Sequence, residues 1–152
     1  MVFGTDHASG FTLIELMLAV GLTALLAAIA MPSYTAYLEG ARVTRAAQDI
    51  RVMASVIQKY QSDYNALPAT LADVNLNGMV DPWGRPYVYY NIVANGKNGC
   101  RRDRALNPLN SDFDLYSVGR DGQTKKQITQ KPSLDDVLRI GDNAYVGLAS
   151  QY

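Results

Sequence analysis

The chain has 152 residues, and its 14 Lys and Arg are balanced by 14 Asp and Glu. A neutral chain has no single-sign field that would recruit nucleic acid, so no nucleic-acid partner is expected. The one cysteine, Cys100, excludes a disulfide within the chain and a zinc site of the Cys-x-x-Cys type. The single histidine, His7, lies near the N-terminus. The rest of the chain therefore lacks the base that Ser/His/Asp and Cys/His nucleophiles require.

An apolar segment near the N-terminus is long enough to cross a membrane. No charged residue occurs from Leu16 to Met31, and counting back to Phe11 gives about 20 residues, enough for a helix across roughly 30 Å of hydrocarbon. A cleavable secretory signal fits poorly, because no Lys or Arg precedes Arg42. The segment carries one carboxylate, Glu15, near its start. A charge in hydrocarbon costs roughly 2.5–3.5 kcal/mol, so Glu15 is a candidate functional residue.

In the stretch GFTLIELM, Gly10 precedes Phe11 and Glu15 is the fifth residue counted from Phe11. Together with Pro32 beyond the apolar run, this stretch closely resembles the N-terminus of type IV pilins and type II secretion pseudopilins. The resemblance implies that a prepilin peptidase cuts between Gly10 and Phe11 and that Phe11 is then N-methylated. It also implies that the apolar helix packs into a filament core, where Glu15 neutralises the terminal amine of a neighbouring subunit. A buried charge is tolerated when it is paired, so Glu15 would fix the register of the assembly.

The same resemblance divides the chain into a leader peptide (residues 1–10), a transmembrane and filament-core helix (residues 11–32), and an amphipathic helix with a globular pilin head (residues 33–152). The leader departs from the family, because it contains Asp6 and no Lys or Arg where family leaders are usually basic. Pro32 is expected to kink the helix, since proline removes a backbone hydrogen bond. In the family the segment before this proline, here residues 24–31, can lose helicity in the filament.

Beyond Pro32 the pattern stays helical and becomes amphipathic. Apolar residues recur at intervals of three and four along one stripe: Val43, Ala46, Ala47, Ile50, Met53, Ala54, Ile57, Tyr60 and Tyr64. We expect this stripe to form the core against a sheet. The helix should end at Asn65 or Ala66, because Pro68 disfavours helical geometry at the residue before it.

The middle of the chain predicts turns and a strand. Residues 73–78 match the opening of an EF-hand loop, but Gly84 stands where the bidentate Glu belongs, so a turn is favoured. DPWGRPYVYY, residues 81–90, resembles the turn of major pseudopilins in which the tryptophan packs over the helix. Aromatic and β-branched residues predict a strand over residues 87–93. The next loop carries four basic residues and is expected to be solvated, with a contact surface as the alternative: Lys97, Arg101, Arg102 and Arg104.

SDFDLYSVGRDGQ, residues 111–123, predicts a strand that ends in a glycine-rich turn. It resembles the start of the calcium-binding loop that major pseudopilins have in place of the disulfide of many adhesive pilins. The resemblance implies Ca2+ ligands, of the oxygen type that calcium prefers, at Asp121, at the carbonyl of Val118, and at Asp135 or Asp136. The loop departs from the family in its lysines, Lys125, Lys126 and Lys131, so a charged surface loop is the alternative. A short last strand is predicted over residues 144–148.

The expected fold is α+β, with a long N-terminal helix packed on a small antiparallel sheet, as in pilins. The expected function is structural and not enzymatic: a subunit of a type IV pilus-like filament, closest to the major pseudopilin of a type II secretion system. The implied partners are further copies in a helical filament, the prepilin peptidase, the inner-membrane assembly platform and minor pilins. The chain would lie in the bacterial inner membrane before assembly and in a periplasmic or extracellular filament after it.

Three alternatives stay open from the sequence. The filament could be a surface type IV pilus. The chain could be a membrane-anchored ligand-binding module, which predicts a concave apolar pocket and an intact N-terminus. It could be an anchored hydrolase with paired carboxylates, either Asp112 with Asp114 or Asp135 with Asp136. Cys100 could be a free thiol or a bridge between two chains.

Overall fold

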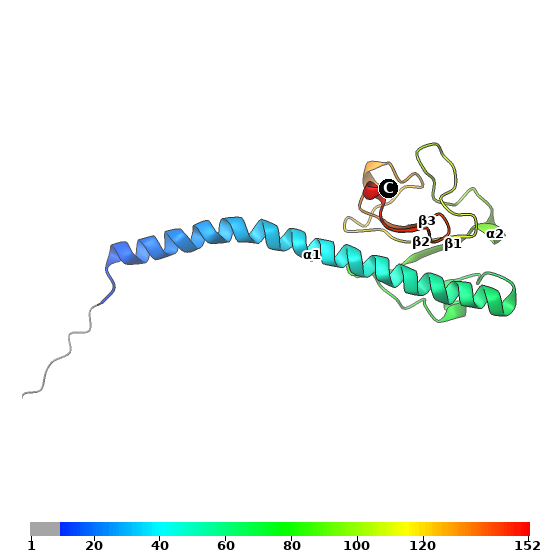
Figure 1. Ribbon diagram of the computed structural model, residues 1–152, viewed down its shortest axis with the longest axis horizontal. Coiled ribbons are helices and arrows are strands. Elements are labelled where there is room, and N and C mark those ends of the chain that lie inside the picture. Colours follow the sequence, from blue (N-terminus) through cyan, green and yellow to red (C-terminus); the bar gives the residue numbers. More distant parts are fainter. Residues whose placement is uncertain (1–9) are drawn as a thin grey trace, which may run out of the picture. The chain divides into compact units, whose positions relative to one another are not determined.

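The computed structural model describes residues 10–152 (Figure 1). Two compact units make up the chain: one ends at Glu39 and the other comprises Gly40–Tyr152. A single helix, α1 (Leu13–Tyr64), forms most of the first unit and opens the second. The leader residues before Gly10, His7 among them, lie outside the described residues.

In the first unit, α1 presents an apolar surface all round. Every large apolar side chain from Leu13 to Met31 is at least 61% exposed. Within the described part of the chain, α1 is the one helix long and apolar enough to cross a membrane. A helix that is apolar on every side is of the kind that lipid or other apolar helices cover.

Pro32 lies inside α1, which is a single helix from Leu13 to Tyr64. Proline has no N–H to donate to the carbonyl one turn earlier. Two neighbouring hydroxyls bond to backbone carbonyls here, Ser33 to Ile29 at 3.4 Å and Thr35 to Pro32 at 2.9 Å. Residues 24–31 are helical. The predicted kink and the loss of helicity in a filament stay predictions.

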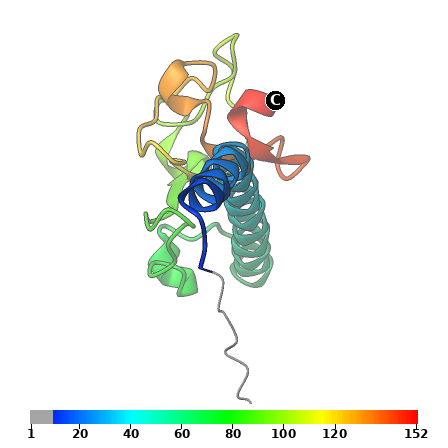
Figure 2. The same ribbon diagram turned by 90° about the vertical axis from the view of Figure 1, so that its left-hand side faces the viewer.

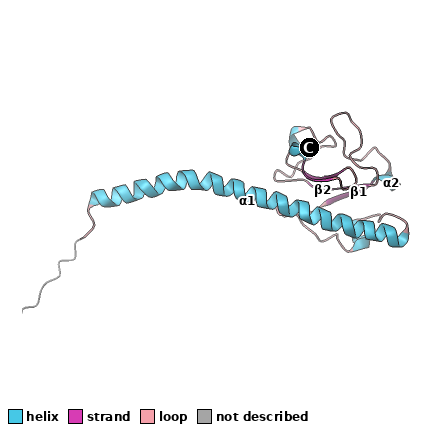
Figure 3. Cartoon of the chain, viewed as in Figure 1, coloured by secondary structure: helices cyan, strands magenta, loops and turns pink. Residues whose placement is uncertain are grey.

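The second unit contains one antiparallel sheet of four strands in the order β1-β2-β3-β4. The strands are β1 (Val88–Asn91), β2 (Phe113–Ser117), β3 (Val137–Ile140) and β4 (Tyr145–Leu148). The remaining elements are short: η1 (Leu71–Val74), α2 (Ile92–Asn95), η2 (Lys131–Ser133) and η3 (Ala149–Gln151). Figure 3 shows that long loops join them. The predicted α+β layout, a long helix on a small antiparallel sheet, is confirmed.

The main core lies between the second half of α1 and one face of the sheet (Figures 1 and 2). Six positions of the predicted stripe are buried: Ala46, Ala47, Ile50, Met53, Ala54 and Ile57. Phe113 and Leu115 of β2 meet them from the sheet, and Trp83 packs at the edge of this cluster. The prediction is wrong for Tyr64, which is 68% exposed because it is the last residue of α1 and stacks on Tyr60 instead.

Other differences from the predicted elements have local causes. β1 stops at Asn91, short of the predicted Val93, because the Asn91 side chain accepts a hydrogen bond from Ala94 N at 2.9 Å and caps α2. The turn interpretation of residues 73–78 is confirmed, since Asn75 adopts a left-handed backbone with φ 57° after η1. β3 is a strand that the sequence did not predict.

Candidate functional site

The predicted processing junction lies in an exposed, non-helical segment immediately before α1. Gly10 is exposed, and Phe11 is 88% exposed. A Cβ placed on Gly10 would meet no atom within 4 Å, so nothing in the described chain requires a glycine at this position. Cleavage after Gly10 and methylation of Phe11 stay predictions.

Glu15 forms a capping box with Thr12 at the start of α1. One carboxylate oxygen, Oε2, accepts hydrogen bonds from Thr12 N and from Thr12 Oγ1, both at 2.8 Å. Glu15 N in turn donates to Thr12 Oγ1 at 3.3 Å. The carboxylate therefore lies beside the backbone of the residue that follows Phe11. The positive end of the helix dipole also favours a negative charge there.

The two head segments that resemble major pseudopilins, residues 81–90 and 111–123, meet at Asp81. The Asp81 carboxylate is buried, with only 3% exposure. Its Oδ1 accepts from Trp83 N at 3.0 Å and from Arg85 N at 2.8 Å. Its Oδ2 accepts from the Ser117 hydroxyl at 2.5 Å, and that hydroxyl oxygen accepts from Gly119 N at 3.1 Å. A buried carboxylate is stable when its acceptors are satisfied in this way. Asp81 therefore joins the turn after η1 to the turn after β2.

Arg85 makes a second link between these turns. Its Nη1 donates to the carbonyls of Gly119 at 2.6 Å and Arg120 at 3.2 Å. Two glycines make the close packing of the turn after β2 possible. A Cβ on Gly122 would lie 2.5 Å from Arg85 Nε, and a Cβ on Gly119 would lie 2.2 Å from the carbonyl oxygen of Asp135. Both glycines have positive φ, 65° at Gly119 and 71° at Gly122, which favours glycine as well.

Of the four predicted calcium ligands, Asp121 and Asp135 lie together, whereas Asp136 is bound to other side chains. Asp121 N donates to Asp135 Oδ2 at 2.9 Å, while Asp121 Oδ1 accepts from Gln123 N at 2.7 Å. Asp136 is fully buried and bonds to Arg101 and Thr124. The fourth, Val118, is half-buried. Among residues 10–152, no group of three or more His, Cys, Asp or Glu side chains is placed to hold a metal ion. Calcium binding stays a prediction.

Arg101 is a buried residue of the head, with 3% exposure, and the expected solvated loop is wrong at this position. Its guanidinium pairs with Asp136, donates to the Thr124 hydroxyl and to the Lys125 carbonyl, and stacks 4.5 Å from the Tyr116 ring centroid. Burial raises the pKa of Asp136 to about 6, against the hydrogen bond from Thr124 and the charge of Arg101. The charge of Arg101 favours the ionised carboxyl, as the ion pair requires.

A second buried arginine, Arg139 of β3, holds Asp112 in a two-point contact, Nη1 to Oδ1 and Nη2 to Oδ2, both at 2.7 Å. Asp114 accepts from Arg101 N at 2.5 Å and from Asn110 Nδ2 at 2.9 Å, and burial raises its pKa. The carboxylates proposed for a hydrolase thus have separate structural partners.

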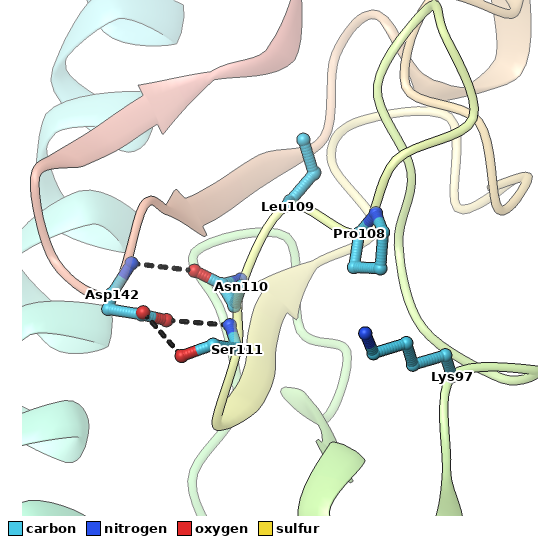
Figure 4. A pocket seen from close by; sticks show the side chains of 6 residues that line it. All are labelled: Lys97, Pro108, Leu109, Asn110, Ser111 and Asp142. Atoms are coloured by element: carbon cyan, nitrogen blue, oxygen red, sulfur yellow. Dashed lines mark hydrogen bonds between the residues drawn. The ribbon is translucent and has the colours of Figure 1, made fainter.

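Figure 4 shows a pocket of about 440 Å³ at the edge of the head, where Asp142 bonds to Asn110 and Ser111 and Lys97 lies across from them. Pro108 and Leu109 complete its lining. Four of these six residues are polar or charged. A ligand-binding module predicts a concave apolar site instead, so this pocket does not favour that alternative.

Cys100 is fully buried, and its thiol donates to the Lys97 carbonyl at 3.0 Å, so a bridge to another chain would require the loop to open.

A helix that is apolar in its first half and amphipathic in its second, a small antiparallel sheet and a carboxylate next to Phe11 define the type IV pilin class of protein. Residues 6–31 match the family model described as the prokaryotic N-terminal methylation motif. The chain is 34% identical over 136 residues to the type II secretion system core protein G of Pseudomonas aeruginosa, with 76% of this chain and 85% of that relative covered. No solved structure matches it significantly.

The chain belongs to the family of type II secretion system core protein G, the major pseudopilins. The corresponding protein of Escherichia coli K12 is 28% identical over 148 residues and covers 82% of this chain and 92% of its own length. A fimbrial protein of Neisseria meningitidis is 32% identical over 146 residues, covering 93% and 84%. Such relatives are structural subunits of filaments, and the apolar helix fits a membrane-anchored protein of this secretion system.

Proposed function

We propose that the chain is a non-catalytic subunit that α1 holds in the bacterial inner membrane and that is drawn from there into a periplasmic helical filament. The observation that carries the proposal is the first half of α1, where every large apolar side chain is exposed and Glu15 is the one charged group from Thr12 to Met31. Lipid can cover this surface before assembly, and the same surface of other copies can cover it afterwards.

Glu15 would provide the register of this assembly. Once Gly10 is removed, the amine of Phe11 becomes a positive charge at the end of an apolar helix. A buried charge of either sign is costly unless it is paired. Glu15 of one subunit and the Phe11 amine of its neighbour can neutralise one another at a fixed axial offset. Contacts of this head-to-tail kind need not close into a ring, so they generate an open filament.

Different partners would act at different stages of filament assembly. A prepilin peptidase would cleave the exposed Gly10–Phe11 junction and supply the substrate for N-methylation. An inner-membrane assembly platform and minor pilins would start the filament and extract subunits from the membrane. The head has no role in catalysis under this proposal, and its buried polar links serve to hold its loops.

A surface type IV pilus is the second candidate, and the fimbrial relative from Neisseria meningitidis favours it. The two candidates differ in what the cell loses without the gene. Loss of a secretion pseudopilus retains exported hydrolases in the periplasm, whereas loss of a surface pilus removes filaments from the cell exterior. Measuring both in one deletion strain distinguishes them.

The direct test is filament assembly with Glu15→Val. We expect the variant chain to insert and to be cleaved, and to enter filaments at less than about a tenth of the wild-type yield, because an unpaired amine would be left in the apolar core. The matched control is Thr23→Val. The Thr23 hydroxyl bonds only to carbonyls of its own helix, Ala19 and Val20, so its removal should leave the yield unchanged. Wild-type yield with Glu15→Val would contradict the pairing.

A further inference from the structure

We propose that two guanidinium groups, those of Arg101 and Arg85, close the loop of residues 118–136 in place of a calcium ion. The resemblance to major pseudopilins implies that calcium holds this loop. Two arginine side chains from outside the loop oppose that role in this chain, because Arg101 pairs with Asp136 and Arg85 donates to carbonyls beside Val118.

Arg101 joins the middle of the loop to its C-terminal end. Its guanidinium donates to the Thr124 hydroxyl and the Lys125 carbonyl on one side and to Asp136 on the other. Thr124 also donates to Asp136 at 2.6 Å. Asp136 is fully buried and Arg101 is 3% exposed, so the pair is shielded from water. A guanidinium has five donors in a planar fork, which lets one side chain make all of these contacts.

Two buried polar atoms of this pair have no partner among the described residues, Arg101 Nε and Asp136 Oδ1. One is a donor and the other an acceptor. They are the two atoms that a two-point pairing of guanidinium and carboxylate would join. In the structure they do not bond to each other, so the ion pair rests on the contact of Nη2 with Oδ2. A divalent cation at Asp136 Oδ1 would also lie against the positive charge of Arg101, which opposes its binding.

Arg85 occupies the other end of the loop. Its Nη1 donates to the carbonyls of Gly119 and Arg120, the backbone oxygens next to Val118. A calcium ion ligated by carbonyls at this turn would have to displace a charged donor or accept its repulsion. The two guanidinium groups together carry the same charge as one Ca2+. The positive charge that holds the loop therefore comes from two side chains of the protein itself.

The two acids that stay exposed or half-buried, Asp121 and Asp135, make a weak remaining site. Each uses one carboxylate oxygen to accept a backbone N–H within the loop. The three exposed lysines of the loop add further positive charge: Lys125, Lys126 and Lys131. Calcium sites become stronger as more charged oxygen ligands gather, and this loop offers few of them in a positive field.

The test measures thermal unfolding of the full chain in detergent micelles by the fluorescence of Trp83, the one tryptophan, which packs at the core of the head. We expect the midpoint in millimolar CaCl2 to equal that in a chelator to within about 1 °C. Arg101→Ala should lower the midpoint by about 10 °C, because it leaves Asp136 buried without its partner. The control Arg120→Ala removes the same charge from an exposed side chain of the loop and should leave the midpoint unchanged.

Calcium that raises the wild-type midpoint by several degrees, with the increase lost in Asp121→Ala, would overturn the proposal. If Arg101→Ala does not fold, Arg101→Lys replaces it: a lower midpoint supports the guanidinium role, because an ammonium lacks the fork, and an unchanged midpoint contradicts it. The calcium comparison on the wild-type chain needs no variant. These outcomes do not depend on filament formation, so they are separate from the test of the proposed function.

Discussion

Thr12 and Glu15 hold each other at the first turn of α1, with the Glu15 carboxylate bound by the Thr12 N–H and hydroxyl at 2.8 Å each. The carboxylate that the filament would use is therefore already fixed at the helix end in the single chain. Since these bonds fix where the carboxylate lies and use only Oε2, we expect Thr12 to position Glu15 for a neighbour's amine.

Thr12→Ala should reduce filament yield, but less than Glu15→Val does. The substitution removes the hydroxyl donor, at a cost of about 1 kcal/mol in capping, and leaves the backbone donor in place. Thr12→Ser keeps the hydroxyl and should assemble like the wild type. Quantifying sheared filaments from the three strains checks the order. Equal yields from the Ala and Ser variants would show that the hydroxyl has no role.

Asp81→Ala should destabilise the head by about 3 kcal/mol and shift the fluorescence of Trp83 to longer wavelength. It leaves the N–H groups of Trp83 and Arg85 and the Ser117 hydroxyl without their acceptor, and each unsatisfied buried group costs about 1–3 kcal/mol. Denaturant unfolding measures the loss.

The control for Asp81 is Asp63→Ala. Asp63 forms an exposed ion pair with Lys59 at 3.1 Å, which is worth at most about 0.5 kcal/mol. Asp81→Asn should lie between the two variants, because its amide keeps the acceptor for both N–H groups. If Asp81→Ala is as mild as the control, Asp81 does not join the two turns.

Much of the fold could be predicted from the sequence because its signals are local. The helical period over residues 43–57 is repeated often enough to identify the buried face of α1, and the aromatic and β-branched run identifies β1. The methylation motif is a continuous stretch, so Gly10, Phe11 and Glu15 could be chosen without any structure.

The buried arginines could not be predicted, because their partners are distant in sequence. Arg101 and Asp136 are 35 residues apart, and Arg139 and Asp112 are 27 apart. Arg139 is a charged residue in the otherwise apolar sequence VLRI of β3, and it breaks the apolar pattern expected of a buried strand. All four residues of β3 are nevertheless buried. Asp112 and the Phe113 ring, 4.0 Å from the Arg139 guanidinium, make that burial possible.

The ionised side chain of Asp142 should stabilise the head, and this contribution should be lost in acid. Burial opposes its ionisation, but the two hydrogen bonds from Ser111 and the charge of Arg139 outweigh this and lower its pKa. A lowered pKa means that the folded state binds fewer protons than the unfolded state. The stabilisation is therefore present above the ordinary pKa of about 3.9 and is lost as pH falls through the folded value.

The corresponding measurement compares the wild type with Asp142→Asn in thermal unfolding at about pH 7 and about pH 2.5. The variant should have the lower midpoint at neutral pH, by a small amount because the side chain is 44% exposed. The two proteins should converge in acid. A difference that is the same at both pH values would assign the effect to packing and not to charge.

The intact mass of the chain in purified filaments tests the account most directly. We expect a single species that begins at Phe11, with the first ten residues removed and one methyl group on the new amine. The membrane fraction of a strain without the prepilin peptidase should contain the uncleaved chain and no filaments. A filament subunit that begins at Met1, or a chain cleaved at Phe11 that never occurs in filaments, would contradict the account.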